Sequence, residues 1–193
     1  LAAIRALGTA NDFQVDATED AGVFNAAALA HYDAVVFMST TGDPLNATQQ
    51  TAFENYIRGG GGYVGVHAAA DTEYEWPFYT HLVGASFRNH PAGTPAATVH
   101  VEDTDDHSTQ GLPAPNWNRT DEWYNYQSPD NPSVGGGGTD YSPRPNVHVL
   151  ITLDESTYAE DDGSDGVDDD HPISWCQRYE GGRSWYTGMG HTD

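Results

Sequence analysis

Histidines are the residues in this chain best suited to acid–base chemistry near neutral pH. There are nine of them, beside seven arginines and no lysine. His67 directly follows the apolar, strand-like residues 63–66 and precedes three alanines. A buried strand that ends on a polar residue followed by small ones is how an α/β protein presents a reactive side chain at the edge of its sheet. At this elbow a serine or cysteine would be a nucleophile, whereas His67 supplies a base.

A second histidine, His191, follows the strand-like residues 182–190. Loops at the carboxyl ends of strands converge over the sheet in α/β folds, so we expect His67 and His191 to share a pocket. The alternative is that each is a loop histidine whose hydrogen bonds organise the backbone.

Residues 119–127 contribute adjacent carboxylates, Asp121 and Glu122. Neighbouring side chains on a strand point to opposite faces, so only one of the two can face the pocket, and we predict that it is Glu122. A carboxylate beside a histidine selects its tautomer and makes it a stronger base. The predicted catalytic residues are therefore His67, Glu122 and His191. A solvated strand edge is the alternative for the two carboxylates.

Aromatic side chains, 11% of the residues, often stand next to polar ones, an arrangement that suits the apolar faces and hydroxyl edges of sugars. Core packing is the alternative for about half of them. Arginine is scarce, and Arg183 either pairs with a carboxylate or binds a substrate carboxylate or sugar hydroxyl. The residues predicted to contact substrate are Asp71, Trp76, His90, Tyr124, Arg183 and Tyr186.

Metal ligation is not predicted, because no closely spaced pair of ligands of the H-x-x-x-H kind occurs. A zinc or iron site built from His67, His191 and a carboxylate stays chemically allowed. The acidic residues 159–171 resemble a calcium loop only in part, since the twelfth position from Asp161 is Pro172 instead of a bidentate glutamate. Weak calcium or sodium binding there is an alternative. The sequence thus predicts no metal and no cofactor.

The lone cysteine, Cys176, excludes an internal disulfide and any zinc site built on cysteines. Its apolar and aromatic neighbours predict a buried structural thiol, because a reactive one needs an accessible, electropositive setting.

The elements that must position these residues alternate in the first half of the chain. Residues 1–7 predict a helix that ends at Gly8, and residues 12–18 alternate like a strand. The apolar run 34–40 predicts a strand buried on both faces of a parallel sheet. Residues 46–60 predict an amphipathic helix capped by Asn46 or Thr48, and a strand ending at His67 follows. This order is typical of βαβ units.

The second half of the chain is predicted to add antiparallel strands. The strand-like segments are 95–103, 119–127, 146–154, 173–181 and 182–190, and residues 76–87 predict a short helix and a turn. Gly181 and Gly182 indicate a hairpin between the last two strands. The segments 131–140 and 159–171 are predicted to be exposed loops. No linker divides the chain, so we expect a single domain over residues 1–193.

The formal net charge of −22 excludes two classes of partner. An acidic chain repels the phosphates of nucleic acids and anionic membrane surfaces. The absence of lysine favours a salt-adapted surface, with specific cation sites as the alternative. No apolar run approaches the roughly 20 residues that span a bilayer. We expect an extracellular or cell-surface location, with the cytoplasm as the alternative.

Several segments, taken together and in order, resemble the trehalose-utilisation (ThuA-like) family of the class I glutamine-amidotransferase-like superfamily. They are YDAVVFMSTTGD, FENYIRGGGGYVGVHAAADT, WPFYTHLVGASFRNHP, DEWYNYQ and HPISWCQRYEGGRSWYTGMGHTD. The resemblance implies an α/β, flavodoxin-like three-layer sandwich whose mostly parallel sheet carries added antiparallel strands. It also implies that His67 occupies the elbow where amidotransferases carry their cysteine, so thiol chemistry at Cys176 is not expected.

The family pattern also has a first strand with a histidine-bearing loop and a closing helix, neither of which these residues contain. We therefore expect a fragment of a larger polypeptide, with other domains of that polypeptide as partners. By resemblance, the predicted function is carbohydrate handling, with a sugar or keto sugar processed by histidine and carboxylate acid–base chemistry. The alternative is a non-catalytic glycan-binding or structural module of a large extracellular protein.

Overall fold

The computed structural model describes residues 1–158 and 170–192. Its centre is a seven-stranded mixed sheet in the order β1-β2-β9-β8-β7-β4-β5. The strands of this sheet, in that order, are Ala34–Met38, Gly62–Val66, Gly182–Thr187, Pro172–Tyr179, His148–Asp154, Ala96–Val101 and Asn116–Thr120. Two short strands, β3 (Ser86–Asn89) and β6 (Asn125–Gln127), form a separate antiparallel pair.

The sheet changes character at β9. Strands β1, β2 and β9 pair in parallel, and from β9 to β5 every pairing is antiparallel. The predicted α/β, flavodoxin-like class with added antiparallel strands is confirmed. The predicted hairpin also forms: Glu180 and Gly181, both with positive φ, connect β8 to β9. Two such residues give the turn whose twist matches that of the strands.

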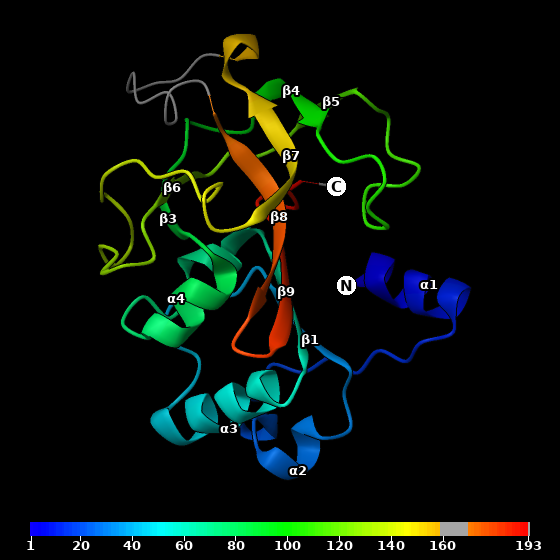
Figure 1. Cartoon of the computed structure of the whole chain (residues 1–193), viewed down its shortest axis with the longest axis vertical. Helices are drawn as coiled ribbons and strands as arrows, with labels where there is room; N and C mark the ends of the chain where they lie inside the picture. Colours follow the sequence, from blue (N-terminus) through cyan, green and yellow to red (C-terminus); the bar gives the residue numbers. More distant parts are fainter. Residues whose placement is uncertain (159–169, 193) are drawn as a thin grey trace.

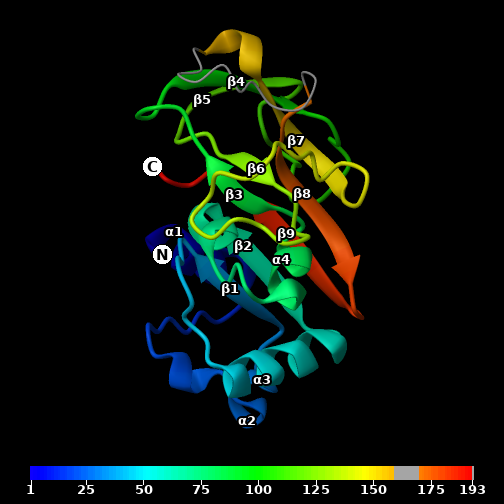
Figure 2. The same cartoon turned by 90° about the vertical axis from the view of Figure 1, so that its left-hand side faces the viewer.

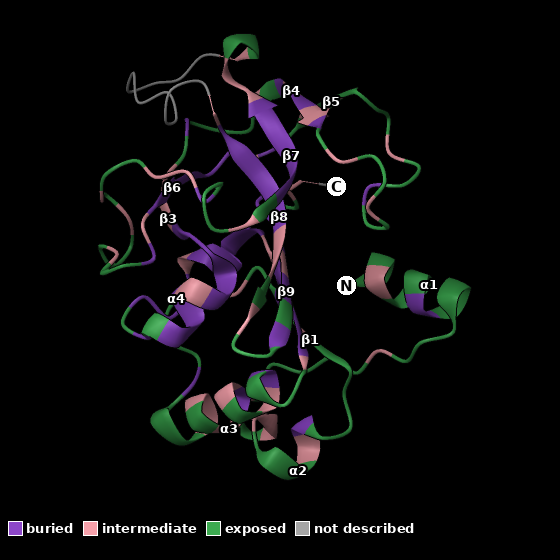
Figure 3. Cartoon of the chain, viewed as in Figure 1, coloured by how far each residue is buried: buried purple, intermediate pink, exposed green. Residues whose placement is uncertain are grey.

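Helices flank the sheet (Figures 1 and 2). They are α1 (Ala2–Asn11), α2 (Ala26–Leu29), α3 (Ala47–Arg58) and α4 (Pro77–Val83), with short 3-10 helices η1 (Ala21–Val23), η2 (His67–Asp71) and η3 (Glu155–Thr157). Helix α3 begins as predicted, with Asn46 and Gln49 forming a reciprocal capping box. It buries Phe53 and Ile57 and connects β1 to β2. Figure 3 shows α4 and the central strands largely buried and α1 largely exposed.

Three predictions about local structure are wrong. Residues 12–18 form no strand, because alternation alone supplies no hydrogen-bonding partner and no strand of the described residues pairs with them. Helix α1 continues past Gly8 to Asn11 and ends where Asp12 adopts φ 61°. Strand β1 is the end strand of the sheet instead of a fully buried one, and Val36 is 41% exposed.

Residues 119–127 are also divided, and this division matters for the site. The segment is not one strand: β5 ends at Thr120 in the large sheet, and β6 begins at Asn125 in the small one. Asp121 and Glu122 lie in the connection between them. The loop 131–140 is mostly exposed, as predicted. Of the acidic stretch 159–171, residues 159–169, including the possible calcium loop, lie outside the described residues.

Candidate functional site

His67 occupies an elbow at the carboxyl end of β2. It begins the 3-10 helix η2 and has φ 51°, a left-handed conformation that is uncommon for residues other than glycine. Its carbonyl oxygen accepts a hydrogen bond from Oη of the buried Tyr186 at 2.9 Å, which stabilises the turn. Only 3% of its surface is exposed. A strained, buried position of this kind is typical of functional sites.

The hydrogen bonds of the His67 ring define its tautomer. Nδ1 lies 2.8 Å from the carbonyl oxygen of Gly188, which can only accept, so Nδ1 carries the hydrogen and donates it. Nε2 is thereby left facing Glu122 Oε2 at 3.1 Å. The ring also packs against Tyr124, with 4.2 Å between centroids.

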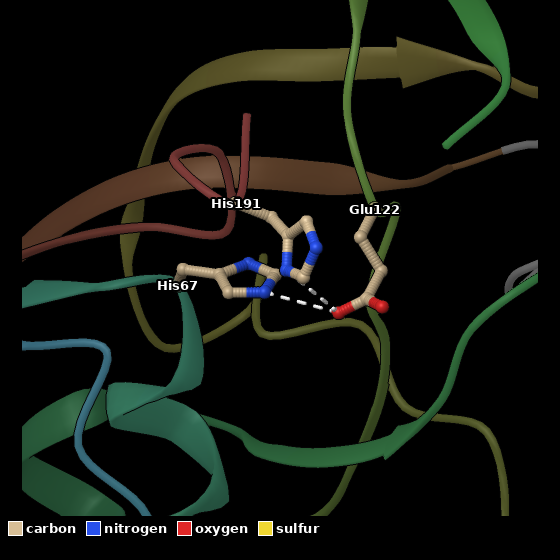
Figure 4. A group of neighbouring side chains, drawn as sticks. All are labelled: His67, Glu122 and His191. Carbon is tan, nitrogen blue, oxygen red and sulfur yellow. Dashed lines mark hydrogen bonds and ion pairs between the residues drawn. The ribbon is translucent and has the colours of Figure 1, made fainter. Parts of the chain in front are cut away.

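Glu122 is the centre of a cluster of histidines. His191 Nδ1 lies 3.5 Å from Oε2, the same oxygen that faces His67 (Figure 4). His90 approaches the other oxygen, with Nε2 3.4 Å from Oε1. Within the described residues no arginine pairs with Glu122. We call His67, His90, Glu122 and His191 the histidine cluster.

The geometry of the histidine cluster requires added positive charge. His90 Nδ1 donates to the carbonyl of Pro91, so its Nε2, like that of His67, carries a lone pair when the ring is neutral. An ionised carboxylate accepts and does not donate, and it therefore repels these lone pairs. The observed approach is favourable only when protons or a cation lie between the nitrogens and Glu122.

Asp121 holds two parts of the cluster in place from behind. It is fully buried, and its Oδ1 accepts the backbone N–H groups of Glu122, His191 and Thr192 at 2.9, 3.0 and 3.3 Å. Oδ2 accepts the N–H of Gly190 at 2.9 Å. A buried carboxylate that gathers several amide hydrogens compensates for its own desolvation. Asp121 thus connects the loop that carries Glu122 to the one that carries His191.

The tyrosines beside the cluster remain protonated phenols. Burial, and then the charges of Glu122 and Asp71, raise the pKa of Tyr124. Tyr74 donates to Asp71 Oδ1 at 2.5 Å, and burial followed by this carboxylate raises the pKa of Tyr74 as well. These buried phenols and Asp71 therefore continue the polar groups of the cluster into the protein.

The structure brings six of the nine predicted site residues to this region, places Tyr186 beneath it in the core, and places Trp76 and Arg183 elsewhere. Trp76 lies in the aromatic core, with its Nε1 donating to Glu54 at 2.9 Å. Tyr186 is fully buried under His67 and supports its backbone. Arg183 is exposed at the amino end of β9, whereas His67 lies level with the carboxyl end of that strand.

Neither the cysteine nor the surface hollow beside Arg144 belongs to the cluster. Cys176 lies on β8 and is half-buried instead of buried as predicted; its partial burial still raises the pKa of the thiol, which disfavours the reactive thiolate. An open hollow of about 400 Å³ is lined by Glu102, Asp103, Arg144, Val147, His148 and Val149. Three titratable groups converge instead at His67, Glu122 and His191, whose ligand atoms all lie within 4.8 Å of one another. Other histidines of the described residues pair with single carboxylates, as His171 does with Glu155, whereas at the end of β2 two histidines share one.

Sequence reasoning assigned no role to Asp121 beyond excluding it from the pocket, and none to the Gly188 carbonyl. Both act through backbone hydrogen bonds that join segments about 70 and 120 residues apart. The one available signal was the pair of adjacent carboxylates, which predicted two different directions for Asp121 and Glu122.

No described helix has the length and hydropathy required to span a bilayer.

Comparison with known proteins agrees with this fold. The ThuA family, described as trehalose utilisation, matches residues 1–193. A ThuA-like protein from Bacteroides uniformis is 26% identical, with a TM-score of 0.70 over 98% of this chain and 73% of its own. A ThuA-like protein from Parabacteroides merdae is 19% identical, with a TM-score of 0.64 over 94% and 67%.

A further solved structure, a protein from Salmonella typhimurium described as cytoplasmic, shares the fold. It is 13% identical, with a TM-score of 0.63 over 97% of this chain and 74% of its own. No curated protein matches the chain. The family match over the whole length, on top of the α/β sheet and the elbow histidine, shows that the chain belongs to the ThuA (trehalose utilisation) family.

Proposed function

We propose that this domain acts on a sugar or keto sugar by histidine and carboxylate acid–base chemistry. The observation that carries the proposal is the convergence of three histidines on Glu122. The exposed fraction of the side chains rises from 3% for His67 through 17% for Glu122 to 48% for His191. A substrate approaching from solvent therefore meets His191 and Glu122 first, and the buried His67 lies behind them.

In the proposed reaction, Glu122 removes a proton from a hydroxyl-bearing carbon beside a keto group. The electron pair left by a C–H bond moves into the adjacent carbonyl, whose oxygen takes a proton from protonated His90 or His191. The product of that step is an enediol. His67, buried and bound to Gly188, shares a proton with Glu122 and so adjusts its basicity.

Three of the aromatic side chains cannot contribute to a glycan-binding platform. Trp123, Trp175 and Tyr186 are fully buried, so they are unavailable to stack on a sugar.

We further propose that the domain works in concentrated salt outside the cell, beside other domains of the same polypeptide. The net charge of −22 supports the salt adaptation.

Deuterium incorporation tests the acid–base proposal. The protein is incubated in deuterated high-salt buffer with mono- and disaccharides and their keto derivatives, and exchange at carbon is followed by NMR. We expect Glu122→Gln to lower the rate roughly 100- to 10,000-fold, the usual contribution of a general acid or base. Glu75→Gln, at an exposed glutamate outside the cluster, should leave the rate unchanged.

Two outcomes would overturn the proposal. Full activity of Glu122→Gln would remove its central residue. Saturable sugar binding by the wild type without any exchange or product would instead identify a glycan-binding module.

A further inference from the structure

We propose that His67 Nε2, Glu122 Oε2 and His191 Nδ1 bind a divalent transition-metal ion such as Zn²⁺. The inference concerns the resting cluster and holds whether or not the domain acts on sugars. Two histidines and one carboxylate are ligands that zinc takes in catalytic sites, where a fourth position stays open for water or substrate. The same set suits non-haem iron.

The two distances from Glu122 Oε2 to the histidine nitrogens fit one ion. Bonds of about 2.0–2.1 Å in a tetrahedral arrangement place two ligand atoms about 3.3 Å apart. Glu122 Oε2 lies 3.1 Å from His67 Nε2 and 3.5 Å from His191 Nδ1. All three ligand atoms are within 4.8 Å of one another. His191, with 48% of its side chain exposed, has room to turn and close the remaining edge.

The hydrogen bonds around the ligands provide an independent observation. His67 donates its other ring hydrogen to a backbone carbonyl, the arrangement by which metal-binding histidines are held in the correct tautomer. Nε2 then points its lone pair at a carboxylate oxygen, an approach that is repulsive unless a proton or cation intervenes. A metal ion satisfies all of these atoms at once.

The surroundings of the cluster also favour a cation. Asp121 lies directly behind it and accepts the N–H groups of Glu122 and His191, so two ligands are held in position before an ion binds. The chain as a whole carries a net charge of −22. With the ion bound, Oε1 of Glu122 and His90 remain available for proton transfer at the exposed side.

Zinc titration tests the proposal without reference to activity. The intact chain is freed of metal with a chelator and dialysed into high salt with excess Mg²⁺, which occupies the surface carboxylates. Zn²⁺ binding is then measured by calorimetry and by competition with a chromophoric chelator. We expect one tight site per chain. His191→Ala and Glu122→Gln should each weaken it about 100-fold, because loss of supporting residues alone costs 10- to 100-fold.

His148→Ala is the matched control. Like His191, His148 is an exposed histidine paired with a carboxylate, lying 2.7 Å from Asp103, and it stands outside the cluster. We expect it to bind zinc as the wild type does. Co²⁺ should also give the intense visible absorption of a tetrahedral site in the wild type and in His148→Ala, and lose it in His191→Ala.

The proposal is overturned if the folded wild type binds no zinc tightly, or if His191→Ala and Glu122→Gln bind it like the wild type. Because His191 is exposed, its replacement should leave the fold intact, which circular dichroism verifies. Sugar exchange measured separately with chelator and with zinc distinguishes the two proposals, since a domain inactive on sugars would still bind the ion.

Discussion

Replacing Asp121 by asparagine tests the idea that one buried carboxylate assembles the site. In the native protein Oδ1 accepts three backbone N–H groups, and Oδ2 accepts that of Gly190 at 2.9 Å. Asparagine keeps one acceptor oxygen, but its NH₂ group must then face the N–H of Gly190, donor against donor. One charge-assisted hydrogen bond is lost outright, and the other three become neutral and weaker.

The magnitude follows from these hydrogen bonds. A hydrogen bond to a charged group contributes about 1.5–3 kcal/mol to stability, compared with about 0.5–1.5 kcal/mol for a neutral one. Relief of the desolvation cost of the buried carboxylate offsets part of the loss. We expect Asp121→Asn to lower the free energy of unfolding by about 2 kcal/mol and to release the loop that carries His191.

Urea unfolding in high salt measures the change in stability, and zinc titration reports on the position of His191. Asp103→Asn is the matched control, because Asp103 also accepts two backbone N–H groups, at 2.9 and 3.2 Å, but does so in contact with solvent. Its replacement should have a much smaller effect on unfolding. An Asp121→Asn protein within about 0.5 kcal/mol of the wild type and with unchanged zinc affinity would refute the reasoning.

Three further predictions concern other parts of the molecule. In Gly188→Ala the new Cβ would overlap Tyr126 Oη and come within 2.7 Å of Ile173, so urea unfolding should show a loss of about 1–3 kcal/mol; wild-type stability would contradict the tight packing. Arg144 lowers the pKa of Glu102 by hydrogen bonding. This pair therefore stabilises the fold at pH values above the ordinary glutamate pKa, and the stabilisation is lost as the pH falls through the lowered pKa of Glu102. Thermal melting should therefore show Arg144→Gln less stable than the wild type by about 1 kcal/mol or less at pH 7, and closer to the wild type in acid. A difference in stability that grows in acid would contradict this pH dependence. Lowering NaCl from about 1 M to about 0.01 M lengthens the screening distance about tenfold, so the melting temperature should fall, and a constant value would argue against a salt-adapted surface.

Much of the local structure was predictable from short stretches of sequence. The capping residue Asn46 and the spacing of Phe53 and Ile57 predicted α3, and the glycines before Arg183 predicted the hairpin of β8 and β9. Such features depend on residues a few positions apart, where backbone sterics and capping dominate. Residues 12–18 and Val36 show where prediction from local sequence fails. Alternation in 12–18 does not reveal whether a neighbouring strand exists, and the apolar character of Val36 does not reveal whether another layer covers it.

Some features of the candidate site were likewise predictable from the sequence, and others were not. The sequence by itself determined the elbow at His67 and the acidic, lysine-free composition, because each is a property of adjacent residues or of composition. The strand alternation used to separate Asp121 from Glu122 does not apply, since both lie in the connection between β5 and β6. Only the tertiary structure decided that His67 and His191 meet at one oxygen of Glu122, that Tyr186 hydrogen-bonds the backbone of the elbow, and that Arg183 lies at the other end of its strand. These outcomes depend on strand order and register, which are set by packing and hydrogen bonds between segments distant in the chain, and no local pattern encodes them.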